Sequence, residues 1–407
     1  MHPAWLPSMP PSTTSDPAFD EILSACDSQG LPQAMESLAG RLRSEGRSHE
    51  LFDLRLMQAR HRAGLPVVAV RSLDELPEAL RLRVEEAYLE ACREVGQLLL
   101  DRGRVRDAWM YLRPVGDRAA MSAALAVVPA DDHYEEIIEI ALHEGVDPEL
   151  GFRLVLKHYG TCNAITMFES EMANRPRAQR QPIASLLIEH LHQELSASVR
   201  SDIERQQGSA PPPGTLGELV ARREWLFAED NYHVDTTHLN AVVRFAHIVD
   251  DPPSLRLALD LTEYGRRLSP AYQFPGEEPF VEMYVASAMF FSALLGTEVD
   301  AALSYFRRRA LECPVAEAGP LAAEVYISLL ARLGRPAAAM DAYAELLPQG
   351  TRTTGFGPSL VDLASQGGDF QRLADICRQR GDLVGFVAGL VQQRSNLATG
   401  TDNGPRA

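Results

Sequence analysis

Apolar side chains recur every three or four positions between residues 322 and 348, which is the spacing of one face of an α-helix. The first stripe ends at Gly334, where a helix end often needs a left-handed residue. Pro336 then stands where a first helical turn tolerates a missing N–H, and Pro348 stops the second stripe. The apolar positions are Ala322, Val325, Tyr326, Leu329, Leu330 and Leu333, then Ala339, Ala342, Tyr343, Leu346 and Leu347. The pattern predicts a helical hairpin that needs a neighbour to bury both stripes.

Two further segments, 85–114 and 283–314, have the same organisation. In each hairpin a turn glycine is followed five residues later by a small residue, and then by Leu or an aromatic residue. The glycine and alanine pairs are Gly103 and Ala108, Gly296 and Ala301, and Gly334 and Ala339. A small residue at this position lets paired helices approach closely. This arrangement resembles the tetratricopeptide repeat.

The resemblance implies stacked helical hairpins, an α-solenoid with a concave groove, and a protein or peptide bound in that groove. The repeats are degenerate, because the spacing between units is irregular and three other glycines are followed by larger residues. These pairs are Gly46 and Leu51, Gly160 and Ile165, and Gly368 and Leu373. No strand-type alternation persists along the chain, so the expected fold class is all-α.

Composition and turn residues predict two helical lobes, a linker between them and a disordered segment at each end. Residues 1–16, rich in Pro, Ser and Thr, are expected to be disordered, as is the tail 395–407. Three consecutive prolines in 206–217 favour an extended spacer. The sequence therefore predicts two helical-repeat lobes, 17–205 and 218–394, joined by this linker.

The net charge of −17 narrows the classes of partner. An acidic surface repels nucleic-acid phosphates and anionic membranes, so neither is expected as a partner. Tetratricopeptide proteins often hold acidic peptide tails with lysine and arginine clamps. For a chain this acidic, we expect a basic or apolar segment instead.

Cysteine usage and the N-terminus indicate a cytoplasmic protein. The five cysteines are odd in number and widely separated, which fits reduced thiols better than a disulfide framework. The N-terminus has no basic start followed by an apolar core, so it does not read as a signal peptide. The most apolar stretch, 283–296, is too short to cross a bilayer.

A first candidate site lies in residues 229–247, which combine carboxylates and histidines. His233, Asp235 and His238 offer imidazole and carboxylate ligands within six residues, a set that suits Zn, Mn or Fe as divalent ions. His247 is about half a turn out of phase with His238 and does not share its face. The alternative is that Asp235 or Thr236 caps a helix and His238 lies on a solvated face.

A second candidate is the polar turn around Gly160. Cys162 would lie near a helix N-terminus, where the helix dipole favours the thiolate, and His158 could act as its base. The alternative is a hairpin turn in which Thr161 caps the next helix and Cys162 is a small filler. Standard phosphate-binding, dinucleotide-binding, nucleophile-elbow and zinc-protease motifs do not occur in the sequence.

Three functions are compatible with these observations. The first is a helical-repeat scaffold that binds a protein or peptide in its groove. The second is a metal-dependent enzyme, such as a hydrolase, with His233, Asp235 and His238 holding the ion and His158 or Cys162 contributed by the other lobe. The third is an all-α assembly partner whose role is its own oligomer, for which the sequence offers no specific feature.

Overall fold

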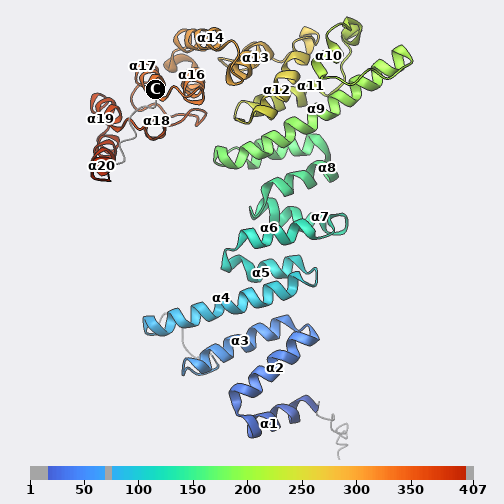
Figure 1. The fold of residues 1–407 in the computed structure, drawn as a ribbon, viewed down its shortest axis with the longest axis vertical. Coiled ribbons are helices and arrows are strands. Elements are labelled where there is room, and N and C mark those ends of the chain that lie inside the picture. The colour runs from blue at the N-terminus through green and yellow to red at the C-terminus, as the bar shows by residue number, and fades with distance from the viewer. Residues whose placement is uncertain (1–16, 69–75, 400–407) are drawn as a thin grey trace, which may run out of the picture. The chain divides into compact units, whose positions relative to one another are not determined.

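The apolar stripes form helices. The computed structural model describes residues 17–68 and 76–399, and these residues form helices and no strand, so the protein is all-α (Figure 1). The hairpin predicted over 322–348 is α16 (Leu321–Arg332) followed by α17 (Pro336–Leu346), and the two helices pack on each other. Gly334 between them has φ 72°, a left-handed conformation that glycine adopts without a steric penalty. The segments predicted as disordered at 1–16 and beyond Thr399 lie outside the described residues.

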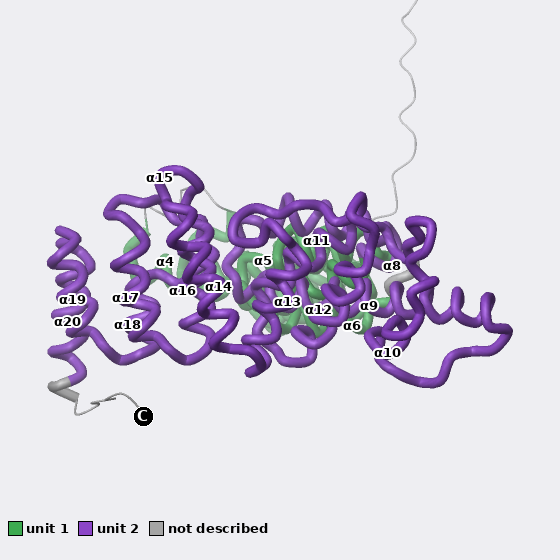
Figure 2. The backbone as a smooth tube through the Cα atoms, turned by 90° about the horizontal axis from the view of Figure 1, so that it is seen from above, with its two compact units in different colours: residues 1–154 green, residues 155–407 purple. Residues whose placement is uncertain are grey.

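The chain divides into two compact units between Leu154 and Val155, inside α8 (Figure 2). In unit 1, a buried core that includes Leu51, Val95 and Ala108 joins α3, α4 and α5. The helices of unit 1 are α1 (Pro17–Gln29), α2 (Leu31–Glu45), α3 (Ser48–Arg62), α4 (Glu78–Leu100), α5 (Val105–Val115), α6 (Arg118–Val127), α7 (Ala130–Ile138), the π-helix η2 (Glu139–His143) and the start of α8 (Pro148–Glu171).

In unit 2, most helices pack on their neighbours in the chain, so that α16 to α20 follow one another in a row (Figure 2). The long helix α9 contacts both α11 and α12. The elements of unit 2 after α8 are α9 (Arg177–Gln207), α10 (Leu216–Val220), η3 (Glu224–Asp230), α11 (Thr236–Ala246), α12 (Pro252–Gly265), η4 (Pro270–Tyr272), α13 (Met283–Leu294), α14 (Val299–Glu312), α15 (Val315–Ala318), α16, α17, α18 (Leu360–Gly367), α19 (Phe370–Gln379) and α20 (Leu383–Thr399).

The predicted lobe boundary at 206–217 does not coincide with this division. The segment connects α9 to α10, and both helices contact α12 within unit 2. Arg200 of α9 donates hydrogen bonds to the carbonyl oxygens of Pro212 and Gly214, at 3.2 and 2.5 Å. The proline-rich segment therefore folds back on the helix that precedes it, because prolines remove N–H donors but leave their carbonyl oxygens available.

Two local expectations differ from the structure. Ala301, expected as the small contact residue of the 283–314 hairpin, is exposed, and its neighbour Ala302 is fully buried. Glu298 has φ 52° just before α14 begins, and the buried alanine comes six residues after Gly296 instead of five. At the C-terminus, α20 continues to Thr399, into the segment expected to be loose.

The packing of α12 on α13 depends on a glycine. A methyl group on Gly265 would lie 2.5 Å from two ring carbons of Tyr284, whose side chain is buried. We expect Gly265→Ala to lower the free energy of unfolding by about 1–3 kcal/mol, the usual cost of overpacking a core. Urea denaturation measures the change.

Gly217→Ala in α10 is the matched control, since the nearest atom to its new methyl group lies at an ordinary 3.8 Å. The control should keep or slightly raise stability, because alanine favours helix over glycine. Equal midpoints for the two variants would contradict the close α12–α13 contact.

Candidate functional site: a cavity between α9, α12, α16 and α18

The predicted metal ligand His233 lies instead in a hydrogen-bonded cluster. Its Nδ1 is 2.9 Å from the hydroxyl of Tyr264, and its Nε2 is 3.1 Å from Oδ2 of Asp202. The side chains of His233 and Asp202 are both almost fully buried. Both ring nitrogens are therefore engaged within the protein, and the imidazole links α9 to α12.

Asp235 has the role of a helix cap. Its Oδ1 accepts hydrogen bonds from the backbone N–H and the hydroxyl of Thr237, at 2.8 and 2.6 Å, and a longer one from the N–H of His238. The bond from Thr237 lowers the pKa of Asp235. Such a cap stabilises the start of α11.

Within 17–68 and 76–399, no three His, Cys, Asp or Glu side chains gather as a metal-binding group would. The structure therefore does not bring His233, Asp235 and His238 together as ligands of Zn, Mn or Fe. The sequence spacing of these three residues could not reveal the arrangement of His233. Its hydrogen-bond partners are Asp202 and Tyr264, each 31 positions away in the chain.

His158 and Cys162 lie on either side of a break in α8. Gly160 has φ 80° and ψ 174°, which is not a helical conformation. The spacing of four residues therefore does not place the two side chains on one continuous helical face. His158 is half-buried and Cys162 is exposed. Between them, Thr161 Oγ1 lies 3.0 Å from Nε2 of His190. The nucleophile and base roles of Cys162 and His158 stay a prediction.

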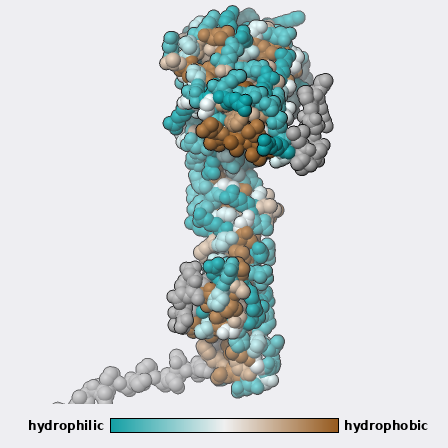
Figure 3. Space-filling model, turned by 90° about the vertical axis from the view of Figure 1, so that its left-hand side faces the viewer, coloured by the Kyte–Doolittle hydropathy of each residue, from teal (hydrophilic) through white to brown (hydrophobic). Residues whose placement is uncertain are grey.

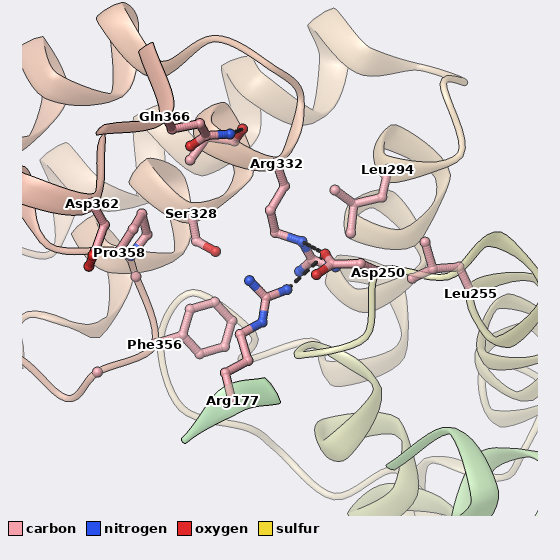
Figure 4. A pocket seen from close by; sticks show the side chains of 13 residues that line it. Arg177, Asp250, Leu255, Leu294, Ser328, Arg332, Phe356, Pro358, Asp362 and Gln366 are labelled. Atoms are coloured by element: carbon pink, nitrogen blue, oxygen red, sulfur yellow. Dashed lines mark hydrogen bonds and ion pairs between the residues drawn. The ribbon is translucent and has the colours of Figure 1, made fainter. Parts of the chain in front are cut away.

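Unit 2 contains a cavity of about 540 Å³ that sequence reasoning did not locate (Figure 4). Its lining combines apolar residues, among them Leu255, Ala331 and Phe356, with polar and charged side chains. The other lining residues are Arg177, Asp250, Leu294, Ser328, Arg332, Gly355, Gly357, Pro358, Asp362 and Gln366. A mixed lining of this kind is typical of a site that takes an apolar group and orients it with a few polar contacts.

Arg332 builds one wall of the cavity. Its Nη1 donates to the carbonyl of His247 at 2.6 Å, Nη2 donates to the carbonyl of Val249, and Nε is ion-paired with Asp250 at 2.8 Å. Burial, and secondarily the charge of Arg177, lowers the pKa of Arg332 to about 10, while Asp250 has the opposite effect. The guanidinium therefore remains charged at neutral pH and neutralises the carbonyl-rich C-terminus of α11.

Arg177 stands at the rim and has donor capacity to spare. Its Nε donates to the carbonyl of Ile248 at 2.9 Å, and its Nη2 to Asp250 at 2.8 Å. Figure 4 shows the guanidinium beside Phe356, with Ser328 directed toward the same space. The remaining nitrogen, Nη1, makes no hydrogen bond to the described residues and can donate to a ligand.

A buried carboxylate holds the loop before α18 against the cavity. Glu324, which is 2% exposed, accepts hydrogen bonds from the N–H and hydroxyl of Thr354 at 2.7 and 2.6 Å. It also accepts from the N–H of Phe356 at 3.0 Å and of Gly357 at 3.5 Å. A methyl group at Gly357 would lie 3.0 Å from the carbonyl oxygen of Glu324, closer than an ordinary van der Waals contact, so the loop lies tightly against α16 here. This network fixes the backbone of the loop that carries Phe356.

One signal in the sequence points to these residues. Glu324 interrupts a helix that is apolar nearly all round, and a charge at a buried position implies partners that satisfy it. The Gly-Phe-Gly-Pro stretch at 355–358 is a second signal, since glycine and proline mark a loop, and this loop carries an aromatic residue. Neither signal identifies Arg177, whose partners lie 71 and 73 residues away.

Comparison of the chain with protein-family models, curated proteins and solved structures gave no match. No helix among the described residues is long and apolar enough to cross a membrane.

Proposed function

We propose that this protein is a helical-repeat scaffold that binds a protein or peptide partner, and that the cavity between α9, α12, α16 and α18 receives one side chain of the bound segment. The observation that carries the proposal is the lining of the cavity, in which the ring of Phe356 lies beside Arg177, whose guanidinium has one nitrogen available. An apolar side chain can pack on Phe356, and Arg177 can donate to a backbone carbonyl of the same segment.

The charges around the cavity support a segment that is not strongly acidic. Arg332 is already bonded to three groups of the α11–α12 connection, so Arg177 is the cation at the rim with an available donor among the described lining residues. Asp362 lines the opposite side and is exposed. A ligand carrying several carboxylates would meet Asp362 and Asp250 as well as Arg177.

A photo-crosslinking amino acid at Gln366 tests the proposal. Gln366 lines the cavity and is exposed, so a probe there should capture the bound polypeptide on irradiation in a cell extract. The matched control is the same probe at Ser365, the neighbouring exposed residue of α18, which does not line the cavity. Adducts of equal yield at both positions, or none at Gln366, would count against a site in this cavity.

The captured segment, made as a labelled peptide, gives the second measurement. We expect Phe356→Ala to weaken its binding about tenfold or more, because truncating a central aromatic anchor commonly costs over 1 kcal/mol. Arg307→Ala, at an exposed ion pair with Glu345 in the same unit, is the control and should leave the affinity unchanged. Fluorescence anisotropy reports both affinities.

A further inference from the structure

The helix α20 exposes an apolar stripe. Leu383 and Val384 are 78% and 81% exposed, and Val387 and Val391 are 55% and 58% exposed. Their spacing places them along one side of the helix. Figure 3 shows apolar side chains gathered into one patch on the face of unit 2 where α20 lies. Four large aliphatic residues on a single helix face form a contiguous patch of the kind that marks an interaction site.

The opposite side of α20 is the one that packs inside the unit. A methyl group at Gly389 would lie 2.9 Å from the carbonyl oxygen of Phe370, and one at Gly385 would lie 2.6 Å from the sulfur of Cys377. Phe386 packs under the guanidinium of Arg378, at 4.8 Å. These contacts place α20 tightly on α19. The exposed stripe is therefore a second apolar face, and no described element covers it.

The charge on α20 favours a second copy of the same chain as the occupant. The chain carries a net charge of −17, yet Arg394 is the one charged residue of α20. Two copies of so acidic a protein repel each other least across a surface without acidic residues, since like charges opposed across an interface are destabilising. A strongly basic partner would instead be expected to meet carboxylates here.

The stripe is also symmetric along the helix. Leu383 and Val391 each lie four residues from Val387, so an antiparallel pair with its two-fold axis at Val387 matches Leu383 of one copy with Val391 of the other. We propose that α20 pairs with α20 of a second copy in this antiparallel arrangement and joins two chains into a dimer.

The charged groups near α20 take no part in this arrangement. Asp382, just before α20, is engaged within its own unit: one oxygen accepts a hydrogen bond from the N–H of Gly385, and the other lies 3.8 Å from the sulfur of Cys377. Arg394 lies beyond the end of the apolar stripe. The antiparallel pairing therefore rests on the four aliphatic residues and not on a charge pair between the copies. This proposal uses α20 alone and does not depend on the peptide-binding function.

Sedimentation equilibrium of the full chain tests the pairing. We expect twice the molar mass of one chain for the wild type and a single-chain mass for Val387→Glu, which opposes two carboxylates on the axis. Val387 is more than half exposed, so the variant should keep its fold, and circular dichroism checks this. Val361→Glu is the matched control: Val361 is 44% exposed on α18, outside the stripe, and this variant should stay dimeric.

Cysteine cross-linking tests whether Val387 lies at the contact between the two copies. In a Cys162→Ser background, which removes the exposed native thiol, Val387→Cys should form a disulfide between two copies when an added copper–phenanthroline oxidant accepts the electrons. Val361→Cys in the same background should not cross-link. A wild-type chain that remains single at high concentration overturns the proposal and assigns the stripe to a different partner. A Val387→Glu variant that remains dimeric also overturns it.

Discussion

Replacing Glu324 with glutamine is expected to lower the free energy of unfolding by about 3–5 kcal/mol, since hydrogen bonds to a charged group contribute about 1.5–3 kcal/mol each. The carboxylate accepts from Thr354, Phe356 and Gly357, and glutamine keeps only one acceptor oxygen while placing an NH₂ group against other N–H donors. Those donors are then left without a partner. Urea denaturation measures the loss, and hydrogen exchange of residues 351–358 should show faster exchange in the variant.

Glu345→Gln provides the comparison for this variant. Glu345 forms an exposed ion pair with Arg307, and such pairs contribute about 0–1 kcal/mol. The two substitutions make the same chemical change in neighbouring helices, so a large difference between them isolates the effect of burial. If Glu324→Gln unfolds at the same urea concentration as Glu345→Gln, the loop is held by contacts other than this carboxylate.

His247 is expected to make the protein acid-sensitive. Burial, with smaller effects from Arg332 and Arg244, lowers the pKa of His247 to about 3. Its Nε2 lies 2.9 Å from the hydroxyl of Ser287, and its ring stacks on Phe280. In the unfolded chain the imidazole of His247 binds a proton near pH 6.5. In the folded chain it binds one only near pH 3.

The sign of the effect follows from this difference. Above pH 6.5 the His247 ring is neutral in the folded and in the unfolded state, and its full contribution to the free energy of unfolding is present. As the pH falls from 6.5 toward 3, the unfolded state binds more protons and the free energy of unfolding decreases. The loss between neutral pH and pH 4 should be about 3 kcal/mol, at about 1.4 kcal/mol per pH unit. His247→Gln keeps a polar group for Ser287 and should remove this part of the pH dependence.

Urea midpoints of the wild type and His247→Gln, measured from neutral pH to pH 4, give the contribution as the difference of two curves. Carboxylates that titrate in the same range are common to both proteins and cancel. Ser287→Ala is the control, because it removes the hydrogen-bond partner without removing a titratable group, and should keep the wild-type slope. Parallel curves for the wild type and His247→Gln would show that His247 titrates as it does in water.

The helices of the three hairpins could be predicted because their signals are local. The stripes at 85–114, 283–314 and 322–348 became the packed pairs α4 with α5, α13 with α14, and α16 with α17. A turn glycine and an adjacent proline act within a few residues, so the sequence contains all the information they need. The one-residue error at Ala301 arose where Glu298 adopts a left-handed conformation, which no residue preference indicates.

The site could not be predicted in the same way because its contacts are distant in the chain. His233 was identified from neighbours within six residues, yet its partners are Asp202 and Tyr264. The cavity likewise combines Arg177 with Phe356, which no local pattern relates. Gly160 marked a turn correctly, but its dihedral angles decide whether His158 and Cys162 share a face.

The hydrogen bonds from Arg332 to the connection after α11 also affect the order in which the helices of unit 2 unfold. Arrays built from adjacent helix pairs can peel open from one end, because each pair touches only its neighbours. The guanidinium of Arg332 instead reaches His247, 85 positions earlier in the chain. The helices between them should melt in a single cooperative step, while α19 and α20, beyond this tie, fray first and exchange their amide hydrogens sooner.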